Sequence, residues 1–206
     1  MNTQIISFAP VTNADRQRAH EIMSATFDGN PAVDFATGSG RGLADRRLEL
    51  AHFLAGYAAD RHGLFFSSDR NGVMVACRSD HSGPALRTLL REIRLVFCAI
   101  GLRRLKRVLI RSARVNRLRA SRGRHIHCWY IGVMNEARGS EAARELQHLL
   151  FDWSDREALP VLAETTIMRN RRAYEFIGFL CYAEVVVGGM TTWLLVRNPS
   201  DSHNTI

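Results

Sequence analysis

The sequence predicts a mixed α/β architecture in one domain, with a sheet and helices packed in layers. Runs in which apolar residues recur at intervals of three and four alternate with short runs rich in branched and aromatic residues. The dipeptide Asn71-Gly72 lies between two apolar runs, as it does in tight β-hairpins. The chain of 206 residues is long enough to bury one sizeable core, and no internal repeat or linker divides residues 1–206.

The first 79 residues predict a strand, two helices and a hairpin. The strand is expected over 4–11, and the first helix begins at Asn13 or Asp15 as N-cap. The apolar face of this helix consists of Ala19, Ile22, Met23 and Phe27. Glycine and proline interrupt residues 28–42, which we expect to form a loop. A second helix is expected over 43–59, and the hairpin over 63–79. One side of the second helix carries Leu48, Ala51, His52 and Ala55.

The net charge of +8 is concentrated in residues 86–124. This segment contains 13 Arg or Lys residues and one acid, Glu92, whereas the remainder contains 15 basic and 19 acidic residues. Its apolar periodicity predicts two basic amphipathic helices separated by Gly101. Three interpretations stay open: a solvated surface, recognition of an anionic acceptor or cofactor phosphates, and contact with nucleic acid or an anionic membrane. Because no aromatic residues are interleaved on the basic faces of these helices, we favour the solvated surface and expect no nucleic-acid partner.

The rest of the chain predicts alternating strands and helices. A long strand is expected over 124–134, and the helix after it ends near Ala158. The apolar face of that helix comprises Ala142, Leu146, Leu149, Leu150 and Trp153. A short strand over 160–166 precedes a helix that runs from about Asn170 to Gly178. Two last strands surround a turn at Gly188 and Gly189, and polar residues 198–206 are expected to fray.

Several classes of protein are disfavoured. The four cysteines are scattered, and neither an HExxH motif nor a Cys/His cluster is present, so no metal site is predicted. The longest apolar run, residues 95–102, is too short to span a bilayer, which takes about 20 residues. No signal-peptide pattern is present at the N-terminus. We therefore expect a cytoplasmic protein with reduced cysteines, and the sequence leaves a homodimer open.

The stretch ARGSEAAR, residues 137–144, joins the long strand to the next helix. A helix N-terminus offers unpaired N–H groups and a partial positive charge, which together bind phosphate. Gly139 lets the backbone approach a ligand closely, and Arg138 supplies a guanidinium suited to phosphate. Glu141 instead places a carboxylate in the first turn, where it repels a phosphate nearby. Taken alone, the stretch is an ordinary helix start.

The order of motifs around this stretch resembles the GNAT superfamily of acyl-CoA-dependent N-acetyltransferases. The segments CWYIGVM, ARGSEAAR, PVLAETT and MRNRRAYEFIGF follow one another at that family's spacing. Residues 138–143 align with its phosphate motif, Gln/Arg-x-x-Gly-x-Gly/Ala, and residues 170–179 with Asn-x-x-x-Tyr-Glu-x-x-Gly-Phe. The last third is most similar to the puromycin N-acetyltransferase group, through ALPVLAETT and GGMTTWLLVRNP. Glu141 departs from the glycine of the phosphate motif, and Asn135 stands where the family usually has proline.

The resemblance implies a GNAT fold with a central, mostly antiparallel sheet of six to seven strands flanked by helices. It assigns residues 125–199 to acyl-CoA binding and residues 1–124 to the acceptor side. It implies backbone contacts to the pantetheine and thioester from Ile131, Gly132 and Val133. The residues implied at the pyrophosphate are Arg138, Gly139, Ser140, Glu141, Ala142 and Ala143. Asn170 would contact the pantetheine arm.

The resemblance also implies catalytic residues. Tyr174 is the expected general acid that protonates the leaving thiolate. Glu164 lies in an otherwise apolar strand, where burial would raise its pKa, so it is an expected general base. A buried acid satisfied by hydrogen bonds is an equal alternative for Glu164, and His127 is a second candidate base. Cys128 has apolar flanks and is expected to be inert.

The expected activity is transfer of an acetyl group from acetyl-CoA to the amine of a small molecule by direct attack. One alternative is a GNAT-fold protein with a degenerate CoA loop that acts as a binding module. Others are acetylation of a protein or peptide amine, and nucleic-acid binding through residues 86–124. The acceptor cannot be named from the sequence, because the resemblance is weak before His125.

Overall fold

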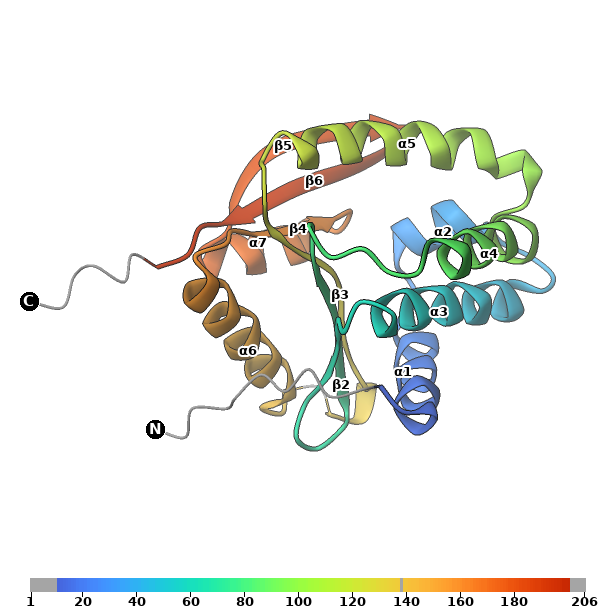
Figure 1. Ribbon diagram of the computed structural model, residues 1–206. Helices are drawn as coiled ribbons and strands as arrows, with labels where there is room; N and C mark the ends of the chain where they lie inside the picture. The colour runs from blue at the N-terminus through green and yellow to red at the C-terminus, as the bar shows by residue number, and fades with distance from the viewer. Residues whose placement is uncertain (1–10, 138, 201–206) are drawn as a thin grey trace, which may run out of the picture.

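A computed structural model describes residues 11–137 and 139–200, and within them six strands form one sheet (Figure 1). The expected strand over 4–11 therefore lies outside the described residues, apart from Val11. The strands are β1 (Leu64–Phe66), β2 (Gly72–Arg78), β3 (Ile126–Val133), β4 (Val161–Thr165), β5 (Leu180–Val187) and β6 (Met190–Arg197). Their order in the sheet is β1-β2-β3-β4-β6-β5. Only β3 and β4 pair in parallel, so the expected mixed, mostly antiparallel sheet is confirmed.

Helices cover both faces of the sheet. They are α1 (Asn13–Thr26), α2 (Pro31–Thr37), α3 (Leu43–Ala59), α4 (Ala85–Leu95), α5 (Leu102–Ala120), α6 (Ala142–Glu157) and α7 (Met168–Phe176). A π-helical turn, η1 (Val96–Ile100), follows α4, and a 3-10 turn, η2 (Asn135–Ala137), precedes α6. No helix among the described residues is both long and apolar enough to cross a membrane.

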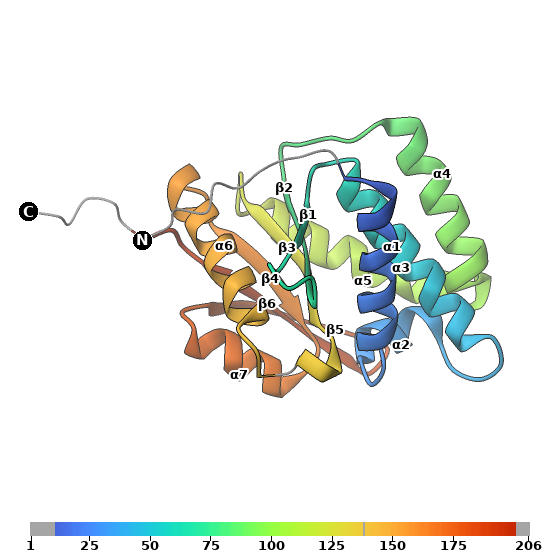
Figure 2. The ribbon, with the colours of Figure 1, turned by 90° about the horizontal axis from the view of Figure 1, so that it is seen from below.

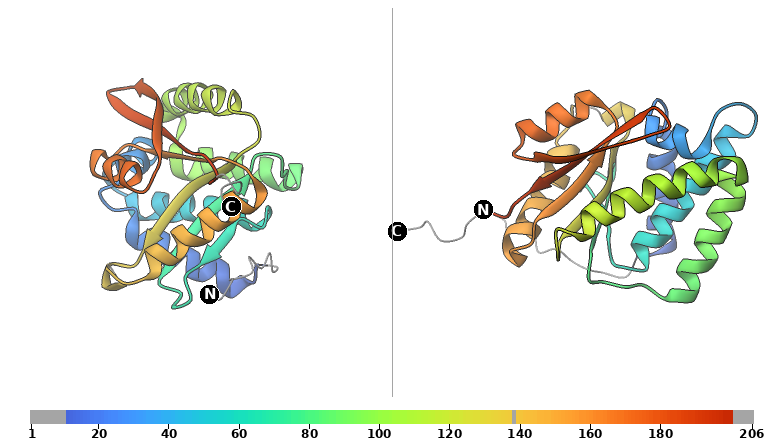
Figure 3. Two further views of the ribbon diagram at one scale, coloured as in Figure 1. Left: turned by 90° about the vertical axis from the view of Figure 1, so that its left-hand side faces the viewer. Right: turned by 90° about the horizontal axis from the view of Figure 1, so that it is seen from above.

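Three apolar clusters show which helices cover which face. The first cluster packs α6 and Tyr174 of α7 against one face of the sheet. The second packs α1 and α3 against the opposite face of β1 to β3 (Figures 1 and 2). The third places α5 and Phe35 of α2 on β5 and β6, on the same side as α1 and α3 (Figure 3). Neighbouring residues of β6 confirm the division, because Leu194 belongs to the third cluster and Leu195 to the first.

Most expected elements are present with small changes at their ends. The N-cap of α1 is Thr12, whose hydroxyl accepts from the N–H of Asp15 at 3.1 Å while the Asp15 carboxylate accepts from the Thr12 N–H. The expected positions Asn13 and Asp15 were therefore one and three residues late, because the reciprocal capping box starts at the threonine. Gly101, with φ +73°, separates η1 from α5 as expected.

Three expectations about local structure are wrong. Residues 28–42 are not all loop, because Asn30 caps α2 and Pro31 begins it. Leu48 is 39% exposed, since α3 turns its alanines together with Leu50 and Leu54 toward the core. The tail does not fray at 198–200, because Ser200 donates its N–H to Asp155 at 2.8 Å. Residues 201–206 lie outside the described part of the chain.

Candidate active site

The β3 and β4 strands pair over only three residues and then part. The parallel ladder runs from Ile126 opposite Val161 to Cys128 opposite Ala163, although β3 continues to Val133. Along its other edge β3 stays paired with β2, where a bulge leaves Trp129 without a partner. The backbone groups of residues 131–133 that point toward β4 therefore have no neighbouring strand. Unpaired backbone groups at such a gap are available to a ligand.

The position of Gly132 in β3 has no room for a side chain. A side chain at this position would run into the ring of Tyr130, which lies against it. The Tyr130 hydroxyl in turn contacts the hydroxyl of Thr26 on α1. The glycine thus lets the tyrosine fold back along β3 and anchor the strand to α1 beside the gap.

The N-terminus of α6 is close in sequence to the end of β3. Gly139 has φ +86°, a conformation that glycine adopts without strain. The Ser140 hydroxyl accepts from the N–H of Ala142 at 3.3 Å. Among the described residues, no group accepts from the N–H of Ala143 or Arg144. These donors remain available to an anion, as expected for a helix start. Arg138, the first residue of the phosphate motif, lies outside the described residues.

Glu141 turns away from these donors. Its side chain is 77% exposed and pairs with Arg144 at 2.8 Å. The carboxylate therefore neither caps the helix nor covers the N–H groups of the first turn. Glu141 stands where the phosphate motif has glycine, but its side chain leaves the backbone N–H groups at the start of α6 accessible.

Two of the expected residues share one face of α7. Asn170 is exposed, and Tyr174, four residues later, is half-buried and packs edge-on against Phe179 at 5.2 Å between ring centroids. The Tyr174 hydroxyl makes no hydrogen bond to a described residue. Burial, with a smaller contribution from Cys128, raises the pKa of Tyr174 above its ordinary value. The phenol therefore keeps its proton at neutral pH.

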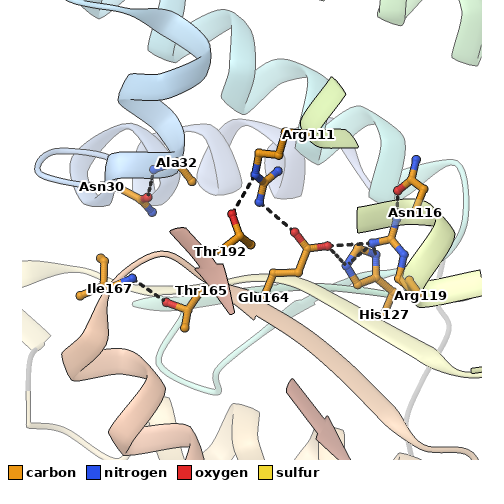
Figure 4. A network of polar contacts seen from close by, with 10 residues as sticks. All are labelled: Asn30, Ala32, Arg111, Asn116, Arg119, His127, Glu164, Thr165, Ile167 and Thr192. Carbon is orange, nitrogen blue, oxygen red and sulfur yellow. Dashed lines mark hydrogen bonds and ion pairs between the residues drawn. The ribbon is translucent and has the colours of Figure 1, made fainter. Parts of the chain in front are cut away.

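Glu164 lies on the other face of the sheet, at the centre of a polar network (Figure 4). Its carboxylate accepts from Arg111 at 3.0 Å and from Arg119 at 3.1 Å, both on α5. Its Oε1 lies 3.5 Å from Nε2 of His127, and the guanidinium of Arg119 lies 2.6 Å from the same imidazole nitrogen. Arg111 donates in addition to the hydroxyl of Thr192 on β6 at 3.1 Å. Three elements far apart in sequence are thus held together by one carboxylate.

The expectation that burial raises the pKa of Glu164 is wrong. Burial does act in that direction, but the hydrogen bond from His127 and the charges of Arg111 and Arg119 outweigh it and lower the pKa to about 2. Burial lowers the pKa of His127 to about 4, against the effect of its hydrogen bond to Glu164. At neutral pH the carboxylate is ionised and the imidazole is neutral. Cys128 is buried, and burial raises the pKa of its thiol to about 12, so it is as inert as expected.

A pocket of about 550 Å³ opens beside His127 on the face covered by α3 and α5. Tyr57 and Trp129 form one wall, with rings stacked at 17° and 4.6 Å between centroids. The remaining lining is mostly polar and includes Arg78, Asp80, Asn116, Arg119 and His125. Sequence reasoning identified neither Tyr57 nor the two arginines of α5 as site residues. The only local signal was that Arg111 and Arg119 lie eight residues apart, on one side of a helix.

Comparisons with known proteins agree on the fold. A structure of an acetyltransferase from Corynebacterium glutamicum, described as histone acetyltransferase HPA2 and related, superposes with a TM-score of 0.62. It is 15% identical, and the match covers 95% of this chain and 97% of that one. Drosophila melanogaster polyamine N-acetyltransferase superposes with a TM-score of 0.60, 15% identity and coverage of 90% and 95%. The chain has the GNAT acetyltransferase fold.

Sequence comparison adds a short match. An uncharacterized N-acetyltransferase from Schizosaccharomyces pombe is 35% identical over 57 residues, which are 26% of this chain and 23% of that relative. The chain thus spans about a quarter of the curated relative that it matches. The sequence matches no protein-family profile. The similarity to the puromycin N-acetyltransferase group within the GNAT fold stays a prediction.

The GNAT fold places the predicted residues in two half-sites on opposite faces of the sheet. Gly139 to Ala143 form the turn into α6 and its first residues, and Asn170 and Tyr174 lie on α7; both helices are on one face. Glu164 and His127 lie on the other face, under α5. Tyr174 and Glu164 are therefore not neighbours on a common surface. The gap where β3 and β4 part lies between the two half-sites.

Proposed function

We propose that this protein transfers an acetyl group from acetyl-CoA to the amine of a small molecule. The observation that carries the proposal is the pair of half-sites on opposite faces of the sheet, with the β3–β4 gap between them. One half-site offers donors for an anionic cofactor, and the other offers a pocket lined by the imidazole of His127, which in turn contacts the carboxylate of Glu164. Two reactants that approach from opposite faces would meet in the gap.

On the first face, the α6 N-terminus would hold the pyrophosphate of coenzyme A. The left-handed Gly139 and the free N–H groups of Ala143 and Arg144 fit a phosphate, and the outward turn of Glu141 leaves them accessible. The pantetheine arm would pass Asn170 and enter the gap beside residues 131–133. Backbone N–H groups there would polarise the thioester carbonyl.

On the second face, the 550 Å³ pocket would hold the acceptor. The stacked Tyr57 and Trp129 favour an acceptor with an apolar or planar body next to its amine. The neutral His127, which lines this pocket, would take the proton from the ammonium form of the acceptor, and Glu164 would hold the imidazole in place. The amine nitrogen would then bond to the acetyl carbon as the carbon–sulfur bond breaks, and its remaining excess proton would pass to solvent to leave the neutral amide. Tyr174 would give its proton to the departing thiolate.

Two alternatives have less support. A binding module with a degenerate CoA loop was motivated by Glu141, whose side chain points to solvent instead of into the loop. Acetylation of a protein or peptide amine requires an acceptor site that a chain can enter, and the aromatic wall closes one side of the pocket.

Calorimetry with acetyl-CoA tests the cofactor half of the proposal, and thiol release with a panel of amines tests the acceptor half. We expect acetyl-CoA to bind, and an arylalkylamine to be acetylated faster than an acetylatable lysine peptide. Glu164→Gln should keep acetyl-CoA binding while turnover falls about a hundredfold, because it lies on the acceptor face. No binding at millimolar acetyl-CoA would exclude the enzyme. Binding only in Glu141→Gly would show that the native loop is degenerate.

A further inference from the structure

The apolar side of α4 faces outward. Leu86, Leu89, Leu90, Ile93 and Phe97, here called the α4 stripe, recur along α4 and η1 and are 46% to 69% exposed. None of the residues of α4 is buried. Single exposed apolar side chains are common on proteins, but five in one continuous row indicate a surface that binds something apolar.

The polar side of the same helix faces the protein. Arg91 forms an ion pair with the buried Asp60 at the end of α3, and Arg94 makes two hydrogen bonds of 2.7 Å to Glu49 of α3. Thr88 also faces inward and accepts from Arg61 at 3.4 Å. Figure 2 shows α4 along the outer edge of the molecule, with α3 between it and α1. These contacts fix the rotation of the helix, so the stripe is held away from the core.

Cations lie around the stripe. Arg87 follows its first leucine, and Arg103 and Lys106 lie in the first two turns of α5, after Gly101. All three are exposed, and within the described part of the chain no carboxylate pairs with them. The surrounding segment, residues 86–124, contains 13 basic residues and one acid. The surface therefore combines an apolar row with unneutralised positive charge.

We propose that the α4 stripe binds the surface of an anionic phospholipid bilayer. The apolar row would enter the boundary between headgroups and acyl chains, with α4 and η1 parallel to the membrane, while Arg87, Arg103 and Lys106 contact lipid phosphates. A second copy of this chain is a worse fit, because it would bring together two segments with the same excess of positive charge. The inference does not depend on the proposed activity, since it uses none of the residues of the candidate active site.

Flotation with lipid vesicles tests this proposal without any measurement of turnover. We expect the protein to float with vesicles of equal parts phosphatidylglycerol and phosphatidylcholine, and to remain behind with phosphatidylcholine alone. Replacing Leu90 and Phe97 together by Ser should reduce the bound fraction about tenfold, because it removes the apolar contact. Arg87→Glu combined with Arg103→Glu should have a similar effect through charge.

Leu180→Ser is the matched control, since Leu180 is 66% exposed on the edge strand β5, outside the stripe. It should float like the unmodified protein. All the substituted side chains are exposed, so the melting temperatures should agree and unfolding can be excluded as the cause. The proposal is wrong if the protein does not float with anionic vesicles, or if the Leu90 and Phe97 variant floats equally well. A dimer in light scattering that this variant converts to a monomer would assign the stripe to a second copy instead.

Discussion

Tyr174 shows how a single residue combines a packing role with a chemical one. Its ring is part of the core beneath α7, in contact with Phe179, yet its hydroxyl makes no hydrogen bond to a described residue. A hydroxyl that stabilises the fold would be bonded, because an unpaired buried polar group costs free energy. The free hydroxyl and its raised pKa together fit a proton donor that stays protonated across the neutral range.

Removal of this hydroxyl should therefore affect catalysis more than stability. In Tyr174→Phe the ring still packs, and we expect kcat to fall about a hundredfold while KM for acetyl-CoA changes little. Steady-state kinetics measures the effect, and the melting temperature should stay close to that of the unmodified protein. An unchanged kcat would remove Tyr174 from the mechanism, because a residue that only packs would give this result.

At the scale of elements, the turn into α6 depends on backbone geometry more than on side chains. Gly139→Val places a branched residue at a positive φ, which strains the loop and should move the free N–H groups. We expect acetyl-CoA to bind about tenfold more weakly, a loss of roughly 1.4 kcal/mol. Glu141→Gly is the comparison variant, and its dissociation constant should stay within about twofold because the native side chain points to solvent.

Calorimetry on both variants separates the two effects. Equal losses in Gly139→Val and Glu141→Gly would mean that the side chain of Glu141 contributes to the site. No loss in Gly139→Val would mean that the α6 N-terminus does not hold the cofactor.

Local sequence signals predicted most of the elements but not the orientation of all of them. The Asn-Gly signal and the alternating branched residues were sufficient to predict the hairpin and β3, because those signals are contained in a few adjacent residues. The turn itself lies at Ser68 to Arg70, with Arg70 at φ +56°, and Gly72 already begins β2. The helix α2 was missed because the glycines after it obscured the Asn30-Pro31 start. The outward rotation of α4 depends on Asp60 and Glu49 of another helix, and no periodicity within α4 contains that information.

At the scale of the whole molecule, the candidate site combines residues that only the fold brings together. The motif around Tyr174 and the turn at Gly139 could be predicted from the sequence, because each consists of residues that are adjacent in the chain. The network around Glu164 could not be predicted from the sequence. Its partners lie on two other elements: Arg111 and Arg119 on α5, and His127 on β3. Their charges also reversed the expected direction of the pKa of Glu164. The apolar neighbours of Glu164 in the strand correctly indicate that it is buried. Burial alone does not determine its pKa, because the neighbouring charges have the larger effect.

Three groups whose pKa values are lowered in the folded protein, His20, His127 and Glu164, should make its stability sensitive to acid in two stages. Burial lowers the pKa of both His20 and His127 from 6.5 to about 4, so the unfolded chain takes up these protons first. Their contribution to stability is complete above pH 6.5 and is lost as the pH falls toward about 4. The pKa of Glu164 is lowered from 4.5 to about 2, so its contribution is lost between those values.

The free energy of unfolding in urea, measured from pH 7 to pH 4, should therefore begin to decrease near pH 6.5, above the range in which carboxylates of the unfolded chain titrate. For His127 alone the decrease should be on the order of 3 kcal/mol. His127→Gln should flatten the slope in this range, because the variant has no imidazole to protonate. His148→Gln, at an exposed position on α6, is the control and should keep the slope of the unmodified protein. If His127→Gln keeps that slope too, the imidazole is not held neutral by the fold, and it would also be the wrong group to take a proton from the acceptor amine.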